Sequence, residues 1–265
     1  MIGKIGASAR GFINMVLELL GMLAVTVRES YHFKMPERRR MFWFLFKRQL
    51  YNSGFKAAYI NALIATILGW LLITMTVSFL PSGVDFVDYY ARIFYIVSIR
   101  EIGPLVSGII LISRSATAVT AELGHTKLKG EFEVVAANRM SPVFLFCLPV
   151  FYAFPLSLLI MFFYFNVICV LSSYIFLLIF TDYGGLLSLS QYLAAVTDKI
   201  TAIEMLTSMA KATLGGLLIG MISVLFAMKV QDRYTDISRA ISGSSTTQLF
   251  VFFLVNVLFS YMAYR

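Results

Sequence analysis

Residues 92–124 read RIFYIVSIREIGPLVSGIILISRSATAVTAELG, an apolar stretch that also carries charged side chains. A helix rises about 1.5 Å per residue, so roughly 20 residues cross a hydrocarbon core of about 30 Å. An ionised group at the centre of such a helix costs roughly 2.5–3.5 kcal/mol, which an inert anchor would avoid. Arg100 and Glu101 therefore indicate a helix that faces partner side chains or a wet cavity inside a membrane protein.

The composition of the whole chain is that of an integral membrane protein. Of its 265 residues, 59% are hydrophobic and only 14% are charged, which is too apolar for an ordinary soluble domain. The net charge of +8 would suit nucleic acid, but the basic residues flank apolar stretches, as the positive-inside rule describes. No nucleic-acid partner is expected.

Five apolar stretches are predicted to cross the membrane: 57–80, 92–121, one span within 143–180, 205–228 and 246–264. The block 143–180 is ambiguous, because a straight helix of that length would extend about 57 Å, too long for one perpendicular span and short for two. Pro149 and Pro155 are expected to break its start into a lateral or re-entrant piece before the true span.

Charge on the connecting segments predicts the orientation. With a single span in the ambiguous block, the basic segments 34–48, 125–139 and 229–239 share one side of the membrane. The more acidic segments 81–91 and 181–204 then share the other side. Basic segments gather on the cytoplasmic side, so the N-terminus is expected inside and the C-terminus outside.

The first 50 residues are predicted to lie along the membrane surface. Polar residues of 8–30 fall in one narrow sector of a helix, and apolar residues cover the rest, as in interfacial helices. A sixth full span is the alternative. Residues 41–50 form an aromatic-then-basic elbow suited to the membrane boundary. The predicted fold is all-α integral membrane, with an interfacial amphipathic helix and elbow (1–50) followed by a five-span domain (51–265).

Residues for catalysis are not evident. No Walker A sequence occurs, so the chain is not expected to hydrolyse nucleotide. His32 and His125 lack the spacing of metal ligands, and neither lies in a predicted span. The chain is therefore predicted to be no enzyme and to bind no metal or cofactor itself.

The charges inside the spans are the strongest functional signal. Glu101 lies about 13 Å from the outer end of its span and Lys211 about 10 Å from the outer end of its own, so the two are predicted to pair. The pair either fixes packing or belongs to a polar seam along a substrate cavity. Arg100 points about 100° from Glu101 and is expected to face a different partner. Arg114, near the inner face, is expected to snorkel to headgroups.

These residues carry a resemblance to a known family. Ile99-Arg100-Glu101-Ile102-Gly103-Pro104-Leu105, then Arg114 and Ala121-Glu122-Leu123-Gly124, resembles the signature of the MlaE/YrbE permeases. Ile237-Ser238-Arg239-Ala240 is similar to a second stretch of that family, and Lys211 falls where the family has a lysine. The segment after residue 124 departs from the family pattern, since Gly130 replaces one acidic residue while Glu133 retains the other.

Such permeases are membrane subunits of ABC transporters that move lipids together with MCE proteins. The resemblance implies a homodimer on two cytoplasmic ATPase subunits, which use the ATP, and a periplasmic partner with an MCE domain. It implies a coupling segment at 122–142 that contacts the ATPase through Glu122, Leu123, Gly124, Glu131 and Glu133. It places Arg100, Glu101 and Lys211 on the lipid path.

The predicted function is that of a permease moving phospholipids or related lipids between the inner membrane and a periplasmic MCE-type carrier, in support of outer-membrane lipid homeostasis. The location implied is the inner membrane of a bacterium. The alternative is a membrane scaffold or channel subunit that works without ATP.

Overall fold

The computed structural model describes residues 2–30, 36–80, 83, 85–180, 188–231 and 233–263, with the backbone alone for residues 2–10, 12 and 36. It is 92% helical, and the described residues form no strand. Five helical stretches are long and apolar enough to cross a membrane: Glu37–Phe79, Phe86–Leu128, Val143–Phe180, Ala202–Met228 and Tyr234–Ala263. The prediction of an all-α membrane protein with five spans is confirmed.

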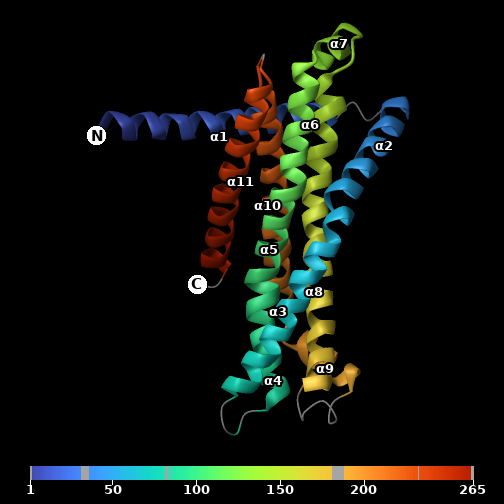
Figure 1. Ribbon diagram of the computed structural model, residues 1–265, viewed down its shortest axis with the longest axis vertical. Helices are drawn as coiled ribbons and strands as arrows, with labels where there is room; N and C mark the ends of the chain where they lie inside the picture. The colour runs from blue at the N-terminus through green and yellow to red at the C-terminus, as the bar shows by residue number, and fades with distance from the viewer. Residues whose placement is uncertain are drawn as a thin grey trace. The chain divides into compact units, whose positions relative to one another are not determined.

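The α-helices are labelled in Figure 1 and have the following bounds: α1 Ile2–Ser30, α2 Pro36–Ser53, α3 Ala58–Phe79, α4 Phe86–Phe94, α5 Gly103–Ile110, α6 Thr117–Leu128, α7 Glu131–Ala137, α8 Leu148–Phe180, α9 Leu189–Asp198, α10 Ala202–Met228 and α11 Tyr234–Ala263. Three π-helical segments adjoin them, at Tyr95–Ile102, Leu111–Ala116 and Val143–Cys147. Segments of π-helix are rare and occur frequently at functional sites.

The chain forms two compact units. Unit 1 comprises Met1–Ser53, Ile112–Pro155 and Leu217–Val251, and unit 2 comprises Gly54–Leu111, Leu156–Gly216 and Phe252–Arg265. Helices α8, α10 and α11 each contribute one part to each unit. The division at residue 50, made on sequence, stays a prediction.

Aromatic packing holds α2 in unit 1. The rings of Phe42 and Phe46 stack with centroids 5.7 Å apart, and both side chains are buried in a cluster with Phe144 and Leu148. Tyr152 meets Phe42 edge-on at 5.7 Å. The predicted elbow therefore lies inside an 18-residue helix whose aromatic side packs on the beginning of α8.

Helix α1 exposes apolar side chains over much of its length. It begins at Ile2, earlier than the predicted residue 8, and Ile13, Leu17 and Leu20 are exposed. Two polar contacts link it to the rest of unit 1: Glu18 pairs with Lys229 at 2.6 Å, and the Ser30 hydroxyl lies 3.0 Å from that of Tyr152. Apolar exposure of this kind is expected of an interfacial helix, and its place on the membrane surface stays a prediction.

A buried polar cluster joins α6, α10 and α11 inside unit 1. The Gln248 amide donates to the hydroxyls of Ser223 and Ser244, each at 2.8 Å. The Thr120 hydroxyl lies 3.3 Å from that of Ser244. All four side chains are buried, so these bonds give the Gln248 amide nitrogen and the three hydroxyls partners in a place that water does not reach.

In unit 2, α3 and α8 approach closely at a glycine. A Cβ added to Gly69 would lie 2.6 Å from the carbonyl oxygen of Cys169, so no larger residue fits without a shift of the backbone. The Asn61 amide donates to the carbonyl of Met161 at 2.8 Å. Small residues and interhelical hydrogen bonds are the usual means of packing membrane helices.

Unit 2 also contains a helix, α9, that the sequence did not lead us to predict. Helix α9 lies in the segment predicted as a loop and begins with a capping box, in which Ser188 and Gln191 bond each other's backbone. Its Tyr192 is fully buried, stacks on Tyr90 at 5.1 Å and shares the Ser173 hydroxyl with it. Burial raises the pKa of the Tyr192 phenol, so this tyrosine stays neutral and acts as a packing residue.

The predicted break at Pro149 and Pro155 is wrong. Helix continues from Val143 to Phe180 as one stretch of 38 residues, with Pro155 inside α8. One proline costs a helix interior about 3 kcal/mol, but Phe154 and Leu158 beside it are fully buried, and their packing retains the helix. The choice of one span for this block was therefore correct.

Candidate functional site

The site in unit 2 is built on the π-helical segment Tyr95–Ile102, which carries Arg100 and Glu101. The N–H of Gly103 bonds to the carbonyl of Ser98, five residues earlier, and a Cβ at Gly103 would overlap that carbonyl. The next residue, Pro104, has no N–H to give to the carbonyl of Arg100. The Arg100 carbonyl therefore receives no bond from position 104, and it accepts a bond from a side-chain donor.

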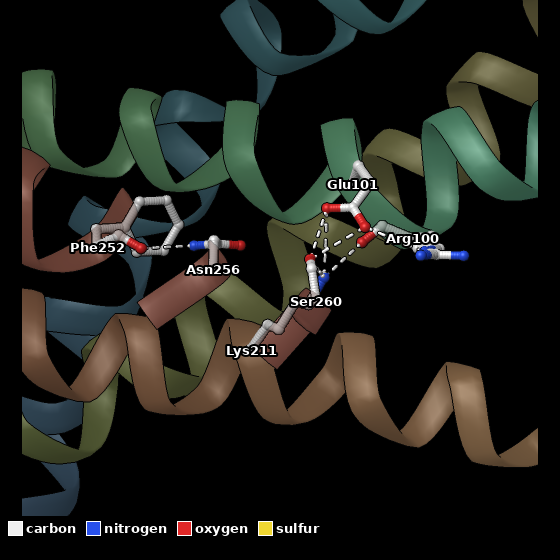
Figure 2. A network of polar contacts seen from close by, with 6 residues as sticks. All are labelled: Arg100, Glu101, Lys211, Phe252, Asn256 and Ser260. Carbon is white, nitrogen blue, oxygen red and sulfur yellow. Dashed lines mark hydrogen bonds and ion pairs between the residues drawn. The ribbon is translucent and has the colours of Figure 1, made fainter. Parts of the chain in front are cut away.

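Lys211 of α10 supplies that donor. Its ammonium lies 3.0 Å from the Arg100 carbonyl, 2.7 Å from the Ser260 hydroxyl of α11 and 3.5 Å from a Glu101 carboxylate oxygen. The Ser260 hydroxyl in turn donates to the Glu101 carboxylate, whose oxygens lie 2.8 and 3.0 Å away. Figure 2 shows the three elements converging on this network.

Burial of the charges is unequal. The Lys211 side chain is 0% exposed, while those of Arg100 and Glu101 are 26% and 36% exposed. A buried ammonium is tolerated only when paired and hydrogen-bonded, and Lys211 has both kinds of contact. The site is therefore a buried lysine with a carboxylate and a guanidinium that remain partly accessible.

The structure brings Glu101 and Lys211 together, as their matched depths predicted. Arg100 Nε donates to Glu101 Oε1 at 3.1 Å, a contact between the two neighbours that the prediction of different partners did not include. The flexible side chains curl towards each other although their Cα–Cβ bonds diverge. Sequence reasoning also missed Ser260, whose only signal was a hydroxyl near the end of an apolar span.

Two glycines fix the helix that carries Ser260. Phe252 of α11 is buried against α5 and α10, where a Cβ at Gly108 would overlap its ring and a Cβ at Gly215 would lie 2.5 Å from it. Figure 2 shows Asn256 between Phe252 and Ser260, with its amide donating to the Phe252 carbonyl at 2.8 Å. The glycines admit the ring, and the ring sets the position of Ser260 beside Lys211.

In unit 1, the predicted coupling segment 122–142 contains a short helix. Helix α6 ends at Leu128, Gly130 turns the chain with φ of +73°, and α7 follows. Phe132 anchors α7, since its ring packs on Phe146 with centroids 4.7 Å apart. The outward residues Glu131, Glu133 and Val134 are exposed, and Val134 is 61% exposed although apolar. An exposed apolar residue that directly follows an exposed acid suits a protein contact.

A cleft of about 300 Å³ lies beside α7. Its charged lining residues are Arg48, Glu122 and Glu131, and Arg48 pairs with Glu122 at 3.2 Å. Of the other predicted coupling residues, Leu123 and Gly124 are buried, and Gly124 packs against Val230 and Ile237. Those two can act on a partner only by holding α6 in place.

The remaining predicted residues give no chemistry of their own. Within the described ranges, no cluster of His, Cys, Asp and Glu side chains could hold a metal. His32 lies outside those ranges, and the ring of His125 lies 6.1 Å from that of Tyr234. Arg114 is half-buried in the π-helical segment Leu111–Ala116, and its predicted contact with headgroups stays a prediction.

Comparison with known families identifies the chain. The family model described as permease MlaE matches residues 46–262, which include both the charged network and the coupling segment. The chain belongs to the MlaE permease family. A comparison with curated proteins finds no match. Membership of the MlaE permeases, together with the five apolar helices, identifies a multi-pass membrane protein and transport subunit of the ABC permease type.

Proposed function

We propose that the chain is the permease of an ABC transporter that moves phospholipids or related lipids between the inner membrane and a periplasmic MCE-type carrier. Two copies form the membrane part, and a pair of cytoplasmic ATPase subunits uses the ATP. The N-terminus lies in the cytoplasm and the C-terminus in the periplasm. The result of transport is lipid homeostasis of the outer membrane.

The charged network carries this proposal. A lipid path needs a broad apolar wall and a few polar groups near one end, because binding sites for such molecules are mostly apolar with a few polar anchors. Arg100, Glu101 and Lys211 supply polar groups on helices that are otherwise apolar. In a dimer, two copies of the network would surround one central space open towards the outer leaflet. A pore for ions would instead need charged side chains or carbonyls along its length.

Helix α7 supports an ATPase partner. Glu131, Glu133 and Val134 are exposed on a helix that Phe132 anchors, so the helix presents a fixed contact surface. Glu122 lies next to this surface and is already paired with Arg48 of α2. A displacement of α6 or α7 by the ATPase would therefore also move α2.

Reconstitution tests the function. The tagged chain, extracted mildly, is expected to copurify with an ABC ATPase and with phospholipid identified by mass spectrometry. The complex in proteoliposomes should move fluorescent phospholipid to its MCE partner only when ATP is present. Lys211→Met should reduce the rate at least tenfold, while Lys47→Gln, an exposed surface change, should not. Copurification of the chain without any ATPase, or lipid movement that is independent of ATP, would favour the scaffold or channel.

Crosslinking tests the coupling segment. Both native cysteines are buried, so a cysteine at Val134 can be modified selectively. Val134→Cys is expected to crosslink to the ATPase and to be protected from an aqueous maleimide in the complex. Ser190→Cys, exposed on α9 at the proposed outer end, serves as the control and should not crosslink. Free reaction of Val134→Cys with maleimide in the assembled complex would show that α7 is not the contact.

A further inference from the structure

A second groove lies in unit 1 where α10 ends and α11 begins. Its volume is about 400 Å³. The residues lining it are Phe226, Lys229, Gln231, Asp236, Arg239, Ala240 and Gly243. It is separate from the charged network and from the cleft beside α7, and neither transport nor ATPase contact uses it.

The base of the groove is apolar and firmly packed. Val230, Ile237 and Ala240 form a buried cluster against which Phe226 and Ala121 pack. Gly124 permits this packing, since a Cβ there would lie 3.2 Å from Val230. Gly243 likewise admits the Phe226 ring, which a Cβ would approach to 2.8 Å. The apolar side of the groove, at Phe226 and Ala240, therefore rests on packed residues.

Two cationic side chains, Lys229 and Arg239, line the groove. Arg239 is 87% exposed and lies 3.9 Å from Asp236, the limit of an ion pair, so most of its donors face outwards. Lys229 is 50% exposed and pairs at 2.6 Å with Glu18 of α1. Lys229 also lies over the Phe226 ring, 5.9 Å from its centroid. Cations therefore lie directly above an apolar floor.

We propose that this groove binds the headgroup of an anionic phospholipid from the cytoplasmic leaflet. The phosphate lies between Lys229 and Arg239, the Gln231 amide donates to the headgroup, and the first part of an acyl chain lies along Phe226 and Ala240. This placement rests on the orientation proposed above, which puts residues 229–239 at the cytoplasmic face. Basic pockets between membrane helices on that face characteristically bind anionic headgroups.

Glu18 gives the site a second property. Its carboxylate contacts Lys229, as a lipid phosphate would, so the two anions compete for one ammonium. Binding of anionic lipid releases α1 from the α10–α11 turn, and loss of the lipid restores the contact. Helix α1, whose apolar side chains are exposed, thus loses its contact with Lys229 when the leaflet contains anionic lipid.

Native mass spectrometry of the purified full-length chain in detergent tests the site. The chain is titrated with dioleoyl phosphatidylglycerol and, separately, with dioleoyl phosphatidylcholine. Phosphatidylglycerol is expected to bind at least tenfold more tightly, and an excess of inorganic phosphate should not displace it, because phosphate lacks the acyl chains. Equal affinity for the two lipids, or displacement by inorganic phosphate, would overturn the proposal.

Variants locate the binding. One cation near a membrane surface contributes about 1 kcal/mol, or about fivefold, so Lys229→Gln with Arg239→Gln should weaken phosphatidylglycerol binding about 25-fold. Glu18→Gln should strengthen phosphatidylglycerol binding several-fold. A misfolded variant would bind the lipid more weakly, so a gain cannot come from misfolding. Lys47→Gln is the control for loss of one positive charge. A control effect as large as that of the double variant, or no gain with Glu18→Gln, contradicts the assignment. Lipid binding and transport are read out separately, so a failure of this proposal is distinguished from a failure of the proposed transport.

Discussion

Glu101→Gln is expected to destabilise the protein by about 3–5 kcal/mol, more than Lys211→Met does. The glutamine variant leaves the fully buried Lys211 ammonium without a counter-charge, which is the costly way to break such a pair. Lys211→Met leaves Glu101 partly exposed and still bonded to Arg100 and Ser260, so a loss of about 1–3 kcal/mol is expected. The free energy of unfolding is measured in bicelles by denaturing detergent, with tryptophan fluorescence as the readout.

The double variant Glu101→Gln with Lys211→Met separates pairing from packing. Replacing a buried ion pair by groups of similar volume is often neutral, so stability should return to within about 1 kcal/mol of the unaltered chain. Transport should stay low, because two of the three charged groups of the network are gone. The charge swap should recover only part of the stability, since a lysine at 101 would lie beside Arg100. If the double variant loses as much stability as the sum of the single variants, the two groups are not coupled.

Gly108→Ala is expected to destabilise unit 2 severely, because its Cβ would overlap the ring of Phe252. Overpacking of a filled core costs typically 1–3 kcal/mol and sometimes more, and a ring also confined by Gly215 has little freedom to move away. The shift of α11 should also move Ser260 away from Lys211. A fall in both the unfolding free energy and ATP-dependent lipid transfer is therefore expected.

A smaller side chain at position 252, whose ring lies against Gly108, provides the matched control. Phe252→Leu alone should cost about 1–3 kcal/mol through lost packing, while Gly108→Ala with Phe252→Leu should be more stable than Gly108→Ala alone. Gly11→Ala, at a position with nothing near its Cβ, should change little. If Phe252→Leu does not rescue Gly108→Ala, the contact between these residues does not set the position of α11.

The sequence predicted features that depend on composition along one helix. Apolar stretches of about 20 residues or more revealed the spans, and similar depth predicted the pairing of Glu101 with Lys211. The coupling segment 122–142 came from the resemblance to the MlaE/YrbE permeases. Each of these properties can be read without knowing which helices are neighbours.

Features that depend on neighbouring helices escaped prediction. Pro155 was expected to end a helix because the packing of Phe154 and Leu158 cannot be seen in sequence. The π-helical spacing at Tyr95–Ile102 has no clear sequence signal, and it changes which way Arg100 and Glu101 point. Helix α9, by contrast, could have been found from Ser188 and Gln191, whose spacing is that of a capping box.

The polar cluster of Thr120, Ser223, Ser244 and Gln248 has a mechanical consequence. If α10 slid along α11 by one residue, the Gln248 amide would lose the Ser223 hydroxyl. If α6 slid along α11, the Thr120 hydroxyl would lose that of Ser244. Water cannot replace the lost partner at this buried place. Smooth translation is thereby resisted, whereas movement of the three helices as one rigid body breaks none of these bonds. The cluster therefore allows the three helices to move together and opposes the sliding of one helix past another.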